Sequence, residues 1–417
     1  MKNALICRLY QKIMYVAEFL IPWRQPRLLT GEGALLKLPM VIAQSGVHSV
    51  LIVTDRGLMD LGLVSPLLDA LQREGIAYCV YDKVVPNPTV TNVEEATKLF
   101  YEGKCAAIVA FGGGSPMDCA KGVGARIARP KKSIQKMRGV LKIRKKIPTL
   151  YAVPTTSGTG SETTLAAVVT DAEKNFKFAV NDPVLIPSVA VLDPMLTVGL
   201  PPSITAATGM DALCHAVEAY IGRSNTRSTK RNAEEAVRLI AQNLVETYRN
   251  GKNVPARAAM QKASYLAGLA FTRAYVGYVH AIAHSLGGKY GIAHGLANAV
   301  LLPHVLKAYG KSAEKKLAKL ADVAGVGTAE ANQKQKARDF IAWLTRLNEE
   351  MHLPAAFEQI REEDLEELSA HAEREANPLY PVPKEMGKED LKKIYRAVMC
   401  PARETAKAVG GQNEELL

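Results

Sequence analysis

The sequence of 417 residues lacks several features that would each assign it to a class. It has no run of 18 apolar residues, so no membrane span is expected, and no internal repeat of the kind that builds solenoids. Its six cysteines are scattered without a CxxC pair, which predicts a reducing, cytoplasmic compartment without disulfides. The composition, 48% hydrophobic and 23% charged, is that of a globular protein long enough for two domains.

Acidic residues are absent from residues 126–146, which hold ten of the basic residues behind the net charge of +12. Such a stretch can bind nucleic acid or anionic lipid. It contains no aromatic residue on which bases could stack, so no nucleic-acid partner is predicted. The alternative is a solvated surface loop.

Residues 1–27 are predicted to form an amphipathic, basic extension. Leu5, Leu9, Ile13, Val16 and Leu20 recur at helical spacing. Such a helix could contact a membrane surface or an assembly partner, or dock onto the protein's own body or a second subunit. The apolar stretch is too interrupted for a secretory signal. Organelle targeting stays an open alternative, because transit peptides are also amphipathic and poor in acids.

Short β-branched runs alternate with helical stretches between residues 28 and 200. The strand-like runs are 49–55, 77–82, 105–115, 149–156 and 188–194. This rhythm predicts a Rossmann-like α/β domain with a parallel sheet between helices. Helical patterns alone follow over residues 201–417, which predicts an all-α second domain. The ligand cleft is expected between the two domains, at the carboxyl ends of the strands.

A glycine loop follows the strand predicted at 105–111. It comprises Gly112, Gly113, Gly114 and Ser115. Ser115 and Asp118 are predicted to form a capping box that opens a helix, whose N-terminus would suit a pyrophosphate. The motif is not GxGxxG, and the acid expected about 20 residues later is absent; Asp55, at the end of an earlier strand, is the candidate for the ribose. The alternative is a glycine turn that binds nothing.

A second loop, residues 153–164, is rich in glycine and small hydroxyl side chains. Thr155, Thr156, Ser157 and Thr159 could donate hydrogen bonds to phosphate or to the nicotinamide end of a cofactor. Two such loops at neighbouring strand ends indicate one extended ligand with phosphate at its centre, such as a dinucleotide.

Histidine is scarce, yet three of the eight histidines lie within residues 280–294. His280 and His284 are four residues apart, as are Asp211 and His215 on another predicted helix, and His294 follows a glycine-rich bend. A carboxylate with several imidazoles suits Fe²⁺ or Zn²⁺. Spacing leaves open which three histidines are ligands, with His280 and His284 as the natural pair. The alternative is a set of core histidines.

Four stretches, GGGSPMDCAK, PTTSGTGSE, GMDALCHAVEAY and HAIAHSLGGKYGIAHGLANAVLLPHV, resemble the signatures of the iron-containing (group III) alcohol dehydrogenase family. The resemblance extends from about residue 28 to the end and includes PNPT at 86–89. It implies an NAD(P)-binding α/β domain, a helical metal domain and a homo-oligomer. The implied metal ligands are Asp211, His215, His280 and His294, with His284 beside the substrate as a catalytic residue. The implied cofactor contacts are Asp55, Asn87, Gly112, Gly113, Gly114, Ser115, Thr155 and Thr159.

These features together predict a metal-dependent alcohol dehydrogenase or aldehyde reductase. Hydride would pass between a primary or small alcohol and NAD(H), with Fe²⁺, or alternatively Zn²⁺, as the Lewis acid. The carboxylate of Asp55 would repel a 2′-phosphate, which favours NAD over NADP. One alternative is a relative resembling dehydroquinate synthase or glycerol dehydrogenase. The other is a non-catalytic metal- and nucleotide-binding protein tethered by residues 1–27.

Overall fold

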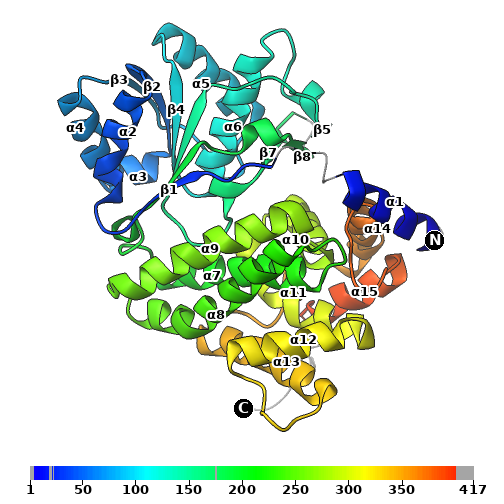
Figure 1. Cartoon of the computed structure of the whole chain (residues 1–417). Coiled ribbons are helices and arrows are strands. Elements are labelled where there is room, and N and C mark those ends of the chain that lie inside the picture. The colour runs from blue at the N-terminus through cyan, green and yellow to red at the C-terminus, as the bar shows by residue number, and fades with distance from the viewer. Residues whose placement is uncertain (1–3, 18–20, 22, 174–175, 401–417) are drawn as a thin grey trace, which may run out of the picture.

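The computed structural model of the chain describes residues 4–17, 21, 23–173 and 176–400. Leu20 of the predicted N-terminal helix and residues 401–417 of the predicted helical domain lie outside the described residues. The chain forms a sheet covered by helices and a separate body of helices beneath it (Figure 1). The predicted fold class, a parallel α/β region followed by an all-helical region, is confirmed.

Six strands form the main sheet in the order β1-β9-β6-β4-β2-β3, and each neighbouring pair is parallel. Their bounds are β1 (Arg27–Thr30), β2 (Ser49–Val53), β3 (Ala77–Tyr81), β4 (Ala107–Gly112), β6 (Thr149–Pro154) and β9 (Val189–Leu192). The chain runs outward from β2 to β3 and returns to β4 on the other side of β2. Open α/β sheets form their ligand crevice at such a reversal, beyond the carboxyl ends of the strands.

Helices cover both faces of this sheet because alternate strand residues point to opposite faces. Val50 and Ile52 of β2 belong to the apolar core under α2 and α4, whereas Leu51 and Val53 belong to the core under α5 and α6. The helices of this part are α2 (Leu38–Gln44), α3 (Arg56–Asp60), α4 (Ser65–Arg73), α5 (Val90–Glu102) and α6 (Gly114–Ala128). Strands buried on both faces account for the nearly continuous apolar runs in the sequence.

A second sheet, which the sequence patterns did not predict, has three strands. They are β5 (Gly139–Val140), β7 (Ala166–Asp171) and β8 (Phe176–Asn181). This sheet draws the acid-free segment 126–146 into the fold. Arg126 Nε donates to Glu94 Oε1 at 2.6 Å, and Arg129 Nε donates to the Ile143 carbonyl at 2.6 Å. Residues 126–146 were predicted to form a solvated surface loop as one alternative. They do so only in part, because Arg126, Arg129 and β5 are bonded within the fold.

The described residues after 200 form nine α-helices. They are α7 (Pro202–Ile221), α8 (Arg227–Arg249), α9 (Val254–Ala274), α10 (Tyr278–Tyr290), α11 (His294–Tyr309), α12 (Lys311–Ala324), α13 (Gln333–Glu350), α14 (Leu365–Ala376) and α15 (Lys388–Ala397). One apolar core joins them, with Met210, Leu213 and Val217 of α7 fully buried. The domain limits at 27/28 and 200/201 remain predictions.

The α/β part and the helical part contact each other at glycine residues. A Cβ on Gly160, in the loop after β6, would lie 2.8 Å from Gly268 Cα of α9. A Cβ on Gly158 would lie 2.7 Å from Thr208 Cβ of α7. Only glycine permits such close approach, so the 153–164 loop is held directly against the helical part.

The N-terminal helix α1 (Ala4–Ala17) lies against the region of α14 and α15 (Figure 1). Its polar side makes the contact: Arg8 donates to the Val382 carbonyl at 2.8 Å and pairs with Glu385 at 3.0 Å, and Gln11 donates to the Tyr380 carbonyl at 2.9 Å. Five of its apolar side chains remain exposed to solvent. They are Leu5, Ile6, Leu9, Ile13 and Val16.

Candidate metal centre and dinucleotide cleft

Four side chains from three helices converge below the loops of the sheet. Asp211 and His215 come from α7, His280 from α10, and His294 is the first residue of α11. One potential ligand atom from each lies within 4.8 Å of all the others. Gly291, with φ 69°, ends α10 and turns the chain so that His294 can reach the group. The pair Asp211 and His215 therefore lies beside the second pair predicted from the sequence. Of that second pair, His280 belongs to the cluster and His284 does not.

The cluster has more hydrogen-bond acceptors than donors. The Asn298 Nδ2 group lies 2.7 Å from Asp211 Oδ1, 3.1 Å from His294 Nε2 and 3.3 Å from His280 Nε2. An amide NH₂ has only two hydrogens, so it cannot satisfy all three acceptors. The buried Nδ1 of His215 has no hydrogen-bond partner among the described residues. A divalent cation would satisfy these surplus lone pairs.

Burial keeps the imidazoles in the neutral form that a metal requires. It lowers the pKa of His294 to about 4, and it moves the pKa of His215 below and that of His280 well below the usual value. Neutral imidazoles and one carboxylate are the ligand chemistry of Fe²⁺ and Zn²⁺. The residues present therefore fit a metal ion of either kind.

Glu218 is a buried residue of this site that the sequence patterns missed. Its two oxygens accept from the Gly277 and Val279 backbone N–H groups at 2.8 and 2.9 Å. Its Oε2 also lies 2.6 Å from His280 Nδ1. Burial raises the pKa of Glu218 to about 7. In the ionised form its oxygens only accept, so Nδ1 of His280 is the donor and its Nε2 lone pair faces the cluster. Glu218 stands seven residues after Asp211, on the same side of α7, and that spacing could have revealed it.

His284 lies outside the four-residue cluster, although it follows His280 by one turn. Its ring stacks on His294 with centroids 5.1 Å apart. Its Nδ1 lies 2.6 Å from Glu375 Oε1, which also accepts from the Tyr380 hydroxyl at 2.8 Å. Burial alone would lower the pKa of His284, but the charge and hydrogen bond of Glu375 outweigh it, so the pKa is raised. Glu375 and Tyr380 were not predicted.

The glycine loop lies where β4 meets the N-terminus of α6. Gly112 has φ 144°, and a Cβ there would lie 2.6 Å from the Pro116 ring. Gly113 caps α6 without any side-chain hydrogen bond, so no capping side chain occupies the N–H groups of the first turn. Cβ atoms on Gly113 and Gly114 would lie 3.5 Å from Thr156 and 3.1 Å from Thr159. The two predicted loops are thus adjacent, and the glycine backbone at the N-terminus of α6 fits a pyrophosphate.

The predicted capping box of Ser115 and Asp118 was wrong. Asp118 accepts from Ser161 Oγ at 3.1 Å and from Val168 N at 3.2 Å, rather than from the start of α6. Nearby, the fully buried Lys121 ammonium lies within 2.7–2.9 Å of two Ser161 oxygens, Thr164 Oγ1 and the Ala166 carbonyl. The sequence motif predicted a helix cap, but Asp118 forms these tertiary hydrogen bonds instead. Together with those of Lys121, they fix the second loop against the first.

The remaining candidates line the same edge of the sheet. Asp55 follows β2 and caps α3, with Oδ1 accepting from Leu58 N at 3.0 Å. Asn87 N donates to Ser115 Oγ at 3.1 Å, and Asn87 Oδ1 accepts from Lys177 Nζ at 2.9 Å. Thr155 N donates to the Gly112 carbonyl at 3.1 Å. Lys177, whose pKa burial lowers, was not predicted.

Comparisons with known proteins decide the family. The model of the iron-containing alcohol dehydrogenases matches residues 25–194, and that of the C-terminal part of the Fe-containing alcohol dehydrogenase family matches residues 205–399. The chain belongs to the iron-containing alcohol dehydrogenase family. Members of this family are oxidoreductases acting on the CH–OH group of alcohols with NAD(H) and Fe²⁺, and the chain is one of them.

Relatives and solved structures agree with this assignment. The chain is 39% identical to 1,3-propanediol dehydrogenase of Klebsiella pneumoniae over 84% of this chain and 91% of that protein. It is 38% identical to alcohol dehydrogenase 4 of Schizosaccharomyces pombe, over 93% of this chain and 90% of that one. The crystal structure of a 1,3-propanediol oxidoreductase superimposes with a TM-score of 0.88 at 37% identity, covering 91% of this chain and all of the other. The dehydrogenase prediction is confirmed, and neither alternative is supported.

Proposed function

We propose that this family member interconverts a small alcohol and its aldehyde in the crevice between the sheet loops and α7, α10 and α11. Asp211, His215, His280 and His294 would hold Fe²⁺ or Zn²⁺. When bound, the metal acts as a Lewis acid on the substrate oxygen, and NAD(H) accepts or donates the hydride. The observation that carries this proposal is the surplus of acceptors at Asp211 and the histidines, directly below two adjacent phosphate-type loops.

The loops would fix the cofactor. The backbone of Gly112, Gly113 and Gly114 and the Ser115 hydroxyl would receive the pyrophosphate at the N-terminus of α6. Thr155, Thr156 and Thr159 would contact the nicotinamide half, and Asp118 would act indirectly by fixing Ser161. Asp55 would take the ribose hydroxyls and disfavour the 2′-phosphate of NADP. Asn87 would tie this cradle to Lys177.

His284 is the proposed proton carrier beside the substrate. Glu375 holds its Nδ1 at 2.6 Å and is itself bonded by Tyr380, so the ring orientation is fixed. A proton taken up by His284 would be stabilised by the Glu375 carboxylate. The His284 side chain is 38% exposed, which gives that proton a path to water.

The decisive assay follows NADH oxidation with a panel of short aldehydes after anaerobic reconstitution with Fe²⁺. We expect turnover with at least one short aldehyde and a NADH preference over NADPH. Metal-loaded protein that turns over none of the panel would contradict the proposal. A parallel series with Zn²⁺ tells which ion supports the reaction.

Two features concern partners and location. No helix among the described residues is both long and apolar enough to cross a bilayer. We propose a cytoplasmic homo-oligomer in which α1 contacts an anionic bilayer surface. The apolar row of α1 points outward, with Leu5 74% and Leu9 60% exposed, and the chain carries a net charge of +12 that anionic lipid would attract.

A second copy of the chain fits the exposed apolar face of α1 less well than a bilayer surface does. A helix of 14 residues is about 21 Å long, and one side of it covers far less than the roughly 800 Å² per partner of a stable interface. Co-sedimentation with anionic and neutral vesicles tests the bilayer, and light scattering tests the oligomer. A Leu9→Glu/Ile13→Glu variant should lose binding to anionic vesicles. Loss of the oligomer in this variant, with vesicle binding unchanged, would instead place a subunit contact here.

A further inference from the structure

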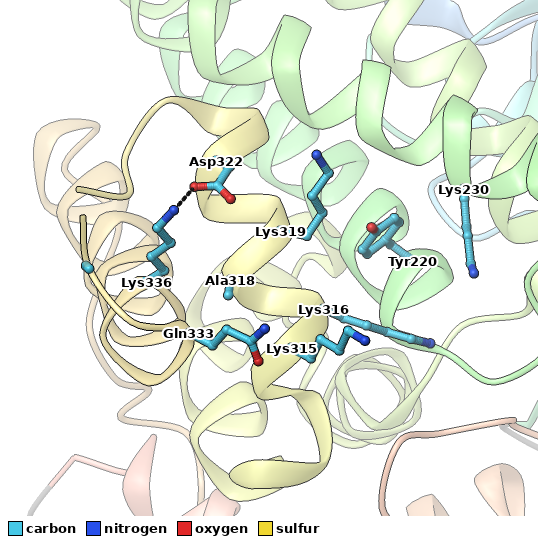
Figure 2. A pocket seen from close by; sticks show the side chains of 10 residues that line it. Tyr220, Lys230, Lys315, Lys316, Ala318, Lys319, Asp322, Gln333 and Lys336 are labelled. Atoms are coloured by element: carbon cyan, nitrogen blue, oxygen red, sulfur yellow. Dashed lines mark hydrogen bonds and ion pairs between the residues drawn. The ribbon is translucent and has the colours of Figure 1, made fainter. Parts of the chain in front are cut away.

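A cavity of about 620 Å³ opens on the helical part, outside the metal and dinucleotide site. It lies between the end of α7, the first turns of α8, the length of α12 and the start of α13 (Figure 2). Five lysines and a single acid are among the residues that line it. They are Lys230, Lys315, Lys316, Lys319, Lys336 and Asp322. Cavities of this volume accommodate small molecules.

Positive charge exceeds negative charge among the residues that line this cavity, although Glu234 interacts with the lining residue Tyr220. Asp322 is engaged by Lys336 at 2.7 Å, as the dashed line in Figure 2 shows. Within the described part of the chain, Lys230, Lys315 and Lys319 form no ion pair within 4 Å. Lys289, on α10 of the same helical part, lies by contrast between two acids. The cavity therefore gathers five like charges around one acid that is already paired.

The positive charge of Lys316 is energetically unfavourable in the folded protein. Its ammonium donates to the Ile221 carbonyl at 2.9 Å and to the Gly222 carbonyl, at the end of α7. Burial lowers the pKa of Lys316 to about 8, and the nearby charges of Lys230 and Arg223 act in the same direction. A bound anion would offset all three effects at once.

The start of α13 adds to the positive field of the cavity. Ala331 and Gln333 line it beside Asn332, the N-cap of this 18-residue helix. The positive end of the helix dipole thus faces the same space as the lysines. Lysines from three helices and the N-terminus of α13 surround a concave space, a shape that fits a compact polyanion better than an extended strand.

We propose that this cavity binds a small molecule carrying two or more phosphate groups. The recognition is by lysine ammonium groups, which act as point charges on phosphate oxygens. The proposal is independent of the dehydrogenase site, because none of the cavity residues belongs to the metal cluster or to the cofactor loops. A phosphate-bearing headgroup and a free phosphorylated molecule share this chemistry.

Isothermal titration calorimetry with inorganic pyrophosphate tests the cavity. The metal-loaded full chain is used with saturating NADH, so that the cofactor loops are already filled. The test variant is Lys230→Gln/Lys319→Gln, and the matched control is Lys37→Gln/Lys393→Gln, which removes the same charge from exposed positions that do not line the cavity. We expect the test variant to bind pyrophosphate at least tenfold more weakly than wild type, with the control unchanged. Any heat from metal chelation is common to all three proteins.

Several outcomes would overturn the proposal. These are no saturable binding to wild type, an equal loss in test and control variants, or equal affinity for inorganic phosphate and pyrophosphate. Should the double variant misfold, as judged by circular dichroism, the single exposed substitution Lys315→Gln gives the same test. Vesicles containing phosphatidic acid form a second arm: retention that depends on Lys230 and Lys319 assigns the phosphate to a lipid headgroup rather than to a free molecule.

Discussion

Helix α7 joins two polar clusters of opposite character. Near its middle, Asp211 and His215 belong to a buried set of side chains in which acceptors exceed donors. At its end, Lys316 belongs to an open set in which donors exceed acceptors. The first set is completed by a cation and the second, by our proposal, by an anion. Burial makes each interaction stronger, so we expect larger effects in the metal cluster than in the lysine cavity.

The largest effect should separate two neighbours on α10. His280→Ala should lose the metal and about 10³-fold of activity, because several kcal/mol of transition-state stabilisation go with the ion. His284→Ala should keep the metal and lose about 100-fold through proton transfer. Metal content by mass spectrometry and kcat for aldehyde reduction check both variants. Full metal in His280→Ala would remove this residue from the proposed ligand set.

Glu218 tests whether the buried cluster depends on the carboxylate that orients His280. Glu218→Gln keeps the side-chain volume but weakens the hold on Nδ1 of His280. Metal affinity should fall about 10–100-fold, while saturating metal should restore most of the activity. The measurement is a metal-chelator competition followed through activity. An unchanged metal affinity would show that the backbone of Gly277 and Val279 is the main partner of Glu218.

The periodic spacing of apolar residues predicted most helices and strands. It did not predict site residues that are placed by single contacts between distant segments. Five of the six main-sheet strands, both loops and the helical second half follow from apolar patterns and glycine, whereas β1 and the three-stranded sheet were not predicted. Glu375 and Lys177 reach the site from distant segments, so no spacing relates them to the histidines. Asp118 read as a helix cap because a local motif cannot reveal competing tertiary bonds.

The N-terminal helix shows a second limit of sequence patterns. Its apolar spacing predicted a helix with two unlike faces, and that helix is present. The pattern could not say which face would dock. Arg8 and Gln11 make the contact with the body, and the apolar face is left outside. The polar side of α1 docks because backbone carbonyls of residues 380–383 accept its hydrogen bonds. The apolar periodicity of residues 1–27 contains no information about these distant acceptors.

The pH dependence of stability distinguishes Lys316 from its neighbours. Its pKa is about 8 in the folded chain and about 10.5 when unfolded, so the unfolded state holds more protons between these values. Stability should therefore rise from pH 8 to 10.5, by roughly a few tenths of a kcal/mol per pH unit after allowing for partial exposure. Lys316→Met should lower this slope in urea titrations, whereas Lys319→Gln should leave it unchanged. Equal slopes in wild type and Lys316→Met would contradict an opposed charge at this position.

The smallest effect concerns the single acid of the lysine cavity. Asp322→Asn removes the negative charge that neutralises Lys336, so that this lysine too can act on a ligand. Because an exposed pair is worth about 0–1 kcal/mol, pyrophosphate affinity should rise by only about two- to fivefold. The matched control is Asp339→Asn on α13, an acid that does not line the cavity. A weaker affinity in Asp322→Asn would mean that the acid positions Lys336 for the ligand, and that the pair, rather than the surplus of lysines, makes the site.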